Sequence, residues 1–223
     1  MNSMIWEPLK LSLLVVTVAT LIIATLGLAL GLLLAKGRFP GQELLASIFT
    51  LPLVLPPTVS GYYLIVLLGR HGLIGESVYN LTGWTVAFTW QAAVIAATVL
   101  ALPLMVLSSR AAIESVNPQF EIASYTLGKS WLATFFLITL PLARRGILAG
   151  IVLSFTRALG EFGATFMLAG NIPGKTQTMP LAIYEAVISG EDKRAQILAL
   201  ILTGVSVAAV YFTNKLSKGA IRY

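Results

Sequence analysis

Cysteine is absent from the 223 residues of this sequence, and histidine occurs once, at His71. A chain without thiols forms neither a disulfide framework nor a thiolate metal site, and one histidine cannot assemble a metal centre. Charged residues are also scarce, at 11%, while hydrophobic residues make up 57%. Soluble domains carry about 25% charged residues. The composition therefore excludes a soluble domain and predicts an integral membrane protein.

Motifs for nucleotide chemistry and catalysis are missing as well. The stretch GNIPGKT is similar to a phosphate loop, but Gly170 lies four residues before Gly174 where the Walker A pattern needs five, and no strand precedes it. No helical His-Glu metal motif and no Ser-His-Asp set is present. The net charge of +6 comes from basic residues that flank apolar runs, which is not the pattern of a nucleic-acid site. We expect no enzyme, no cofactor and no nucleic-acid partner.

Long apolar segments predict an all-α chain with five transmembrane helices in a single domain over residues 1–223. A hydrocarbon core of about 30 Å needs about 20 apolar residues in a helix. The first run follows no basic region and is longer than a signal-peptide core, so we expect a retained span. The expected spans are about 11–35, 44–69, 86–109, 146–170 and 195–214. An odd number of spans places the termini on opposite sides of the membrane.

Lysine and arginine predict the orientation, because cytoplasmic loops carry an excess of both. With the N-terminus outside, nine basic residues lie inside and five lie outside. The inner residues are Lys36, Arg38, Arg110, Lys129, Arg144, Arg145, Lys215, Lys218 and Arg222; the outer ones are Lys10, Arg70, Lys175, Lys193 and Arg194. We therefore expect the C-terminus, and the 117–141 segment, in the cytoplasm.

The segment 117–141, NPQFEIASYTLGKSWLATFFLITLP, predicts two short helices joined by a turn. Asn117 is a suitable N-cap and Pro118 suits the first helical position. Glu121 lies in the first turn, where the helix dipole favours a carboxylate. Gly128 predicts the turn, and we expect the second helix to stop before Pro141.

Each of the two helices has an apolar face. Phe120, Ala123 and Leu127 recur at helical spacing in the first, and the second carries Trp131, Phe135 and Ile138. The segment is unsuited to crossing a bilayer yet strongly patterned. It therefore predicts a docking element for a partner outside the membrane; the alternative is a helix lying on the headgroups of membrane lipid.

The spacing of the segment resembles the EAA loop of the membrane subunits of ABC importers. That motif runs Glu-Ala-Ala, three residues, Gly, nine residues, Ile, one residue, Leu-Pro. The tail from Gly128 fits completely; at the front Ile122 takes the Glu position, and Glu121 lies one residue early. The resemblance implies a coupling helix that seats in a groove of a cytoplasmic ATPase dimer. The implied coupling residues are Glu121, Ala123, Ser124, Leu127, Gly128, Trp131, Ile138, Leu140 and Pro141.

Prolines interrupt the second span. Pro52, Pro56 and Pro57 lack an amide hydrogen and exclude a straight helix, so the freed carbonyls must face protein or a water-filled path. Thr58 and Ser60 supply hydroxyls nearby. The stretch LPLVLPP resembles molybdate-type permeases, which implies that Pro56, Pro57, Thr58 and Ser60 line the translocation pathway and gate. A kinked packing helix is the alternative.

Two charges lie within the expected fourth span. Arg157 and Glu161 are four residues apart, so they share a helix face and can pair. One interpretation is a structural ion pair inside the bundle. The other is that Arg157 attracts an anion in transit and Glu161 holds or releases it. The surrounding TRALGEFGAT also resembles molybdate permeases.

Small residues predict close contacts between helices. They recur every four residues in two spans, at Gly146, Gly150, Ser154 and Ala158 and at Gly27 and Gly31. Five helices make a thin wall around a path for a dianion, so two facing copies are the economical enclosure. We expect a homodimer, which is also the arrangement that the resemblance implies.

The segment before the last span predicts a short helix over 180–189, ended by Gly190, with Leu181, Tyr184 and Ile188 on one side. The resemblance implies that it dips toward the cavity and helps meet a periplasmic oxyanion-binding protein. A capped surface helix is the alternative.

The resemblance extends from the KGRFPG turn at 36–41 to NIPGKTQTMP at 171–180. It implies the type I ABC importer permease fold, in the bacterial inner membrane, with molybdate as the substrate and ATP hydrolysis by a separate subunit. Tungstate and sulfate are alternative substrates. A secondary transporter or channel is the alternative class, but the repeats typical of such folds are not visible.

Overall fold

The computed structural model describes residues 2–219, and this part of the chain is helical without a strand. Arg222, used above for the orientation, lies outside the described residues. The helices are α1 (Asn2–Lys36), α2 (Gln42–Val54), α3 (Pro57–Leu68), α4 (Gly75–Thr82), α5 (Trp90–Glu114), α6 (Pro118–Thr126), α7 (Trp131–Thr134), the π-helix η1 (Phe135–Thr139), α8 (Leu140–Leu159), α9 (Gly163–Ala169), α10 (Met179–Ile188) and α11 (Asp192–Gly219).

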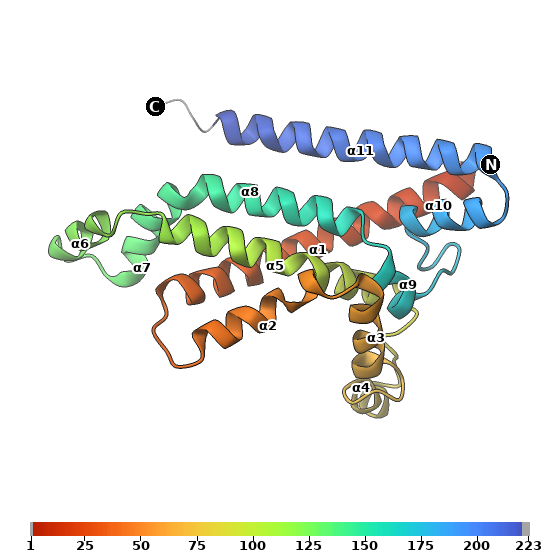
Figure 1. Ribbon diagram of the computed structural model, residues 1–223, viewed down its shortest axis with the longest axis horizontal. Coiled ribbons are helices and arrows are strands. Elements are labelled where there is room, and N and C mark those ends of the chain that lie inside the picture. Colours follow the sequence, from red (N-terminus) through yellow and green to blue (C-terminus); the bar gives the residue numbers. More distant parts are fainter. Residues whose placement is uncertain (1, 220–223) are drawn as a thin grey trace.

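The long helices run side by side along the longest axis of the molecule (Figure 1). Within the described part, four helical stretches are long and apolar enough to cross a membrane, and the bent pair of α2 and α3 makes up to five. The four are Met4–Lys36, Trp90–Glu114, Trp131–Leu159 and Asp192–Tyr211. Figure 1 places α6, α7 and the end of α11 at one end of the bundle, and α9 and α10 at the other. The all-α membrane fold is therefore confirmed.

Helix α5 is the centre of the bundle and packs against both α1 and α8, which also contact each other. A Cβ atom at Gly31 of α1 would lie 2.5 Å from Cβ of Ser109, and one at Gly150 of α8 would lie 2.7 Å from Cβ of Ser108. The small-residue stripes of the first and fourth spans therefore bring their backbones against α5 of the same chain. These stripes are therefore not available as the contact surface for a second copy of the chain.

The second span bends by 115° between α2 and α3. Leu55 and Pro56 both precede a proline, and both have extended backbones, with ψ angles of 141° and 138°. This is the conformation that a following proline ring enforces. Pro52 stays inside α2, so the Pro56–Pro57 pair makes the break.

The expected start of the fourth span was wrong, as was the helix end before Pro141. The helix that begins at Trp131 continues through η1 into α8 and reaches Leu159. In η1 the backbone hydrogen bonds span five residues instead of four, so the amide of Leu140 donates to the carbonyl of Phe135. Pro141 follows in the first turn of α8, where its missing N–H is tolerated.

The expected end of this span near Gly170 was also wrong. Helix α8 ends at Leu159, and α9 is a separate short helix that begins at Gly163. Phe162 between them has a φ of −127°, which is not helical. The break has a local cause, since the Glu161 carboxylate accepts a hydrogen bond from the amide of Ala164 (2.8 Å) and so caps the first turn of α9.

The packing against α5 predicts a stability difference between two glycine substitutions. Gly31→Ala places a methyl group against Ser109 and the amide of Arg110, so we expect about 1–3 kcal/mol of destabilisation. Gly204→Ala in α11 meets no atom within 4 Å and serves as the control. Thermal unfolding in detergent, followed by tryptophan fluorescence, measures both. Equal melting temperatures would contradict the close α1–α5 contact.

Candidate functional site

The first part of the segment 117–141 forms two short helices, α6 and α7, joined by the expected turn. The side chain of Asn117 accepts a hydrogen bond from the amide of Gln119 (3.0 Å), and Ser130 caps α7 by accepting from the amide of Ala133 (3.3 Å). Gly128 has a φ of +77°, in the left-handed region that glycine adopts without strain. We call residues 117–134 the loop 117–134, and the continuous helix Trp131–Leu159, whose first turn is α7, the α8 span.

The apolar stripe of α6 faces away from the bundle. Leu127 is 80% exposed and Phe120 is 55% exposed, and Ala123 is exposed beside them. Two polar residues of the helix face inward instead, with the Glu121 side chain 13% exposed and Ser124 buried at 7%. A soluble amphipathic helix buries its apolar face, so this reversed arrangement leaves an apolar surface without a partner among the described residues 2–219.

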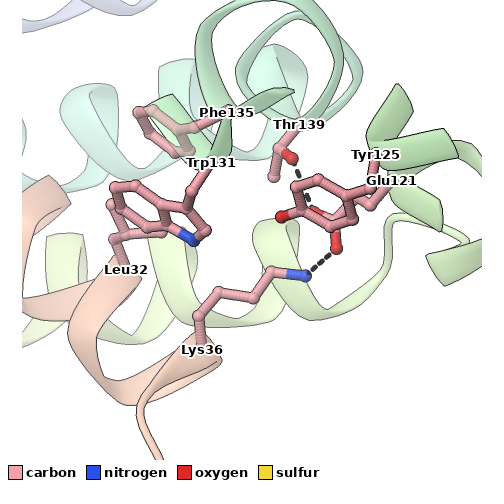
Figure 2. A pocket seen from close by; sticks show the side chains of 7 residues that line it. All are labelled: Leu32, Lys36, Glu121, Tyr125, Trp131, Phe135 and Thr139. Atoms are coloured by element: carbon pink, nitrogen blue, oxygen red, sulfur yellow. Dashed lines mark hydrogen bonds and ion pairs between the residues drawn. The ribbon is translucent and has the colours of Figure 1, made fainter. Parts of the chain in front are cut away.

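Polar contacts hold the inner side of α6 (Figure 2). Lys36, the last residue of α1, forms an ion pair of 2.7 Å with Oε2 of Glu121. Thr139 donates a 2.6 Å hydrogen bond to Oε1 of the same carboxylate. The hydroxyls of Ser124 and Thr134 form a buried hydrogen bond of 2.9 Å between α6 and α7.

These contacts set the ionisation of Glu121. Partial burial by itself raises the pKa of a carboxyl, but the hydrogen bonds from Lys36 and Thr139 outweigh it and lower the pKa of Glu121 below its usual range. The carboxylate therefore stays ionised at neutral pH. The sequence does not reveal Lys36 or Thr139 as its partners, since Lys36 lies 85 residues away and its position predicts only the orientation in the membrane.

A small pocket lies between the end of α1 and the loop. Its lining residues come from α1, α6, α7 and η1, and they are Leu32, Lys36, Glu121, Tyr125, Trp131, Phe135 and Thr139. The volume of about 20 Å³ holds about one water molecule. Trp131 and Phe135 stack with centroids 6.0 Å apart on the side facing Leu32 (Figure 2). Trp131 thus lines the pocket at the end of the loop, while Ile138, Leu140 and Pro141 lie farther along the α8 span.

Arg157 and Glu161 form an ion pair of 2.6 Å at the junction of α8 and α9. Glu161 is 3% exposed, whereas the Arg157 side chain is 29% exposed. Arg157 lies in the last turn of α8, where the helix dipole favours a cation. Each charge therefore has the other as its partner, and the carboxylate also caps α9 through Ala164.

The bend of the second span packs against this junction. A Cβ at Gly163 would lie 3.0 Å from Cβ of Pro57 and 3.3 Å from Cγ2 of Thr58. The two stretches that resemble molybdate permeases, 51–57 and 156–165, are thus neighbours in space. Pro56, Pro57 and Thr58 are exposed, while Ser60 is 5% exposed and its hydroxyl has no partner among the described residues.

The short helix near 180–189 is present as α10. The amide of Met179 donates to the buried hydroxyl of Ser12 (2.7 Å), which ties the helix to α1. Leu181 is fully buried, but Tyr184 and Ile188 are 42% and 65% exposed, so the three residues do not share one environment. Tyr184 packs against Phe162 at the α8–α9 junction, with ring centroids 5.2 Å apart.

The family of binding-protein-dependent transport system inner membrane components matches residues 27–221. The chain belongs to this family. It is 44% identical over 214 residues to the molybdenum transport system permease protein ModB of Escherichia coli K12, covering 96% of this chain and 93% of the relative. It is also 42% identical over 210 residues to the putative molybdenum transport system permease protein YvgM of Bacillus subtilis, covering 94% and 92%.

A solved structure shares the fold of this permease. The chain is similar to a bacterial alginate ABC transporter that was crystallised with an alginate-bound periplasmic protein, with a TM-score of 0.77 and 17% identity. The match covers 95% of this permease and 77% of that chain. The predicted type I ABC importer permease fold and the predicted family are therefore confirmed.

The α8–α9 junction predicts that removal of one charge damages the permease more than removal of both. Arg157→Ala leaves the Glu161 carboxylate buried without its cation, and we expect a loss of about 2 kcal/mol or more. Arg157→Ala with Glu161→Gln removes both charges and keeps an acceptor for the amide of Ala164. Its melting temperature in detergent should exceed that of the single variant. Equal damage would contradict a structural ion pair.

Proposed function

We propose that this permease forms the translocation pathway of an ATP-driven importer for molybdate in the bacterial inner membrane. The observation that carries the proposal is the 44% identity to a molybdenum transport permease over 96% of the chain. Tungstate and sulfate are alternative substrates, because both are tetrahedral oxyanions with two negative charges. ATP is hydrolysed by a separate subunit dimer.

The ATPase docks on the outer face of the loop 117–134. Four exposed apolar side chains form the docking surface, namely Phe120, Ile122, Leu127 and Leu132. The loop lies at one end of the bundle, and α10 lies at the other (Figure 1). A periplasmic oxyanion-binding protein at the α10 end delivers the substrate, so the two partners act from opposite sides. The N-terminus is then outside and the C-terminus is cytoplasmic.

The pathway runs past the bend of the second span and the α8–α9 junction. Pro56, Pro57 and Thr58 are exposed there, and Arg157 places a partly exposed cation at the α8–α9 junction, whose Gly163 lies against Pro57 and Thr58. A second copy of the permease supplies the facing wall, since five helices alone make a thin wall around a path for a dianion. The contact between the copies uses other surfaces than the small-residue stripes of α1 and α8, which face α5. Closure of the ATPase dimer draws the two loops together and switches the bundle between outward-open and inward-open states.

Transport in proteoliposomes tests the function. The permease, the ATPase and the oxyanion-binding protein are reconstituted, and the uptake of radiolabelled molybdate is measured with and without ATP. We expect uptake that requires ATP and both partners. Excess sulfate should reduce this uptake less than excess unlabelled molybdate does. Uptake by the permease alone would indicate a channel or a secondary transporter, and stronger competition by sulfate would indicate a sulfate importer.

The turn at Gly128 tests the docking role separately. A Cβ there meets no atom within 4 Å, so only the backbone conformation with its φ of +77° opposes a side chain. Gly128→Val imposes about 1–2 kcal/mol of strain in that conformation and should lower co-purification of the ATPase. Gly128→Asn is the matched control, because asparagine tolerates the left-handed region. Unchanged co-purification with valine would contradict docking at this loop.

A further inference from the structure

We infer that Lys36, Glu121 and Thr139 form a latch that connects the docking loop to two transmembrane helices at once, α1 and the α8 span. The inference rests on the proposed function, since it assigns the residues through which the loop acts on the pathway. The latch is distinct from the docking surface, which is made by the outward-facing apolar side chains of α6 and α7.

The geometry gives each carboxylate oxygen of Glu121 its own partner. Oε2 pairs with Nζ of Lys36 at 2.7 Å, and Oε1 accepts from Oγ1 of Thr139 at 2.6 Å (Figure 2). Lys36 is the last residue of α1, and Thr139 is the last residue of η1. One side chain of α6 therefore bridges two separate spans, α1 at its last residue and the Trp131–Leu159 helix at η1.

The charges suit the helices that carry them. The C-terminal end of α1 favours the cation of Lys36, and the N-terminal turn of α6 favours the carboxylate of Glu121. The side chains are 29% and 13% exposed, so water screens this pair less than it screens a surface pair. The Ser124–Thr134 hydrogen bond is a second contact between α6 and the helix that continues into α8, whereas the ion pair of Glu121 is the contact that reaches α1.

The latch depends on the ionised carboxylate. The pKa of Glu121 is lowered in the folded state, so the contribution of the latch to stability is fully present above the ordinary value of 4.5. It is lost as the pH falls through the lowered pKa. At neutral pH the connection is therefore intact.

Movement at the loop can then reach both sides of the bundle. Through Lys36 it acts on α1, whose Gly31 lies against Ser109 of α5. Through Thr139 it acts on the helix that continues to Arg157 at the α8–α9 junction. A loop joined to one of these helices alone would move that helix against the other. The bridging carboxylate makes α1 and the α8 span follow the ATPase together.

The test measures the ratio of molybdate transported to ATP hydrolysed in the reconstituted complex, and compares this ratio between wild type and variants. Lys36→Gln and Glu121→Gln should each lower this ratio about fivefold or more, while ATPase co-purification and hydrolysis continue. Lys36→Glu with Glu121→Lys should recover part of the ratio, since the pair is restored but both helix dipoles oppose it. Arg38→Gln is the control, because Arg38 is an exposed cation at the same end of α1. Ratios equal to that of the control would overturn the latch.

A second measurement does not depend on transport. Trypsin cleaves after Lys129, an exposed residue in the turn between α6 and α7. We expect several-fold faster cleavage there in purified Glu121→Gln than in wild type and in Arg38→Gln. Equal rates would overturn the latch, whereas failure of the wild-type complex to import molybdate would overturn the proposed function and leave the cleavage result valid.

Thr139→Val gives a milder version of the test. It keeps the ion pair and removes one hydrogen bond. It therefore tests the latch even if a charge variant fails to assemble with the ATPase. The ratio of transport to hydrolysis should fall to a value between wild type and Glu121→Gln, with cleavage at Lys129 changed in parallel. An unchanged ratio together with an unchanged cleavage rate would contradict the bridge to η1.

Discussion

The close contact of α1 and α8 with α5 is the constraint on which the rest of the molecule depends. In lipid, apolar side chains gain little by leaving the solvent, so helices associate through tight van der Waals packing of small residues. Gly31 and Gly150 place two backbones against Ser109 and Ser108 of the central helix. This packing fixes the distance between the ends of α1 and of η1, and only then can one carboxylate, Glu121, reach both Lys36 and Thr139.

The α8 span is altered at both of its ends, and both alterations have a function in the proposed transporter. At the loop end, η1 widens the helix ahead of Pro141 and presents Thr139 to Glu121. At the opposite end, Glu161 caps α9 and pairs with Arg157, where the bent second span packs. One continuous helix thus connects the loop 117–134 with the α8–α9 junction, and polar contacts that lipid could not supply hold each end.

Local rules explain which predictions held and which were wrong. The N-cap at Asn117, the turn at Gly128 and the break at Pro56–Pro57 follow from residues adjacent in sequence, and all three are present. Pro141 also obeys a local rule, but the π-helix before it lets the helix continue, so the expected helix end was wrong. The partners of Glu121 lie 85 and 18 residues away, a distance in sequence at which spacing carries no information.

The sequence by itself determined the membrane class, the family, the approximate positions of the apolar spans except the fourth, and the turn of the loop, because hydropathy, caps and prolines act over a few residues. Only the tertiary structure decided that the glycine stripes face α5 of the same chain, that the apolar stripe of α6 points away from the bundle, and that Glu121 is a bridging residue. The physical reason is that facing and pairing depend on how helices distant in sequence pack together. Helical periodicity shows which residues share a face, but not what that face meets.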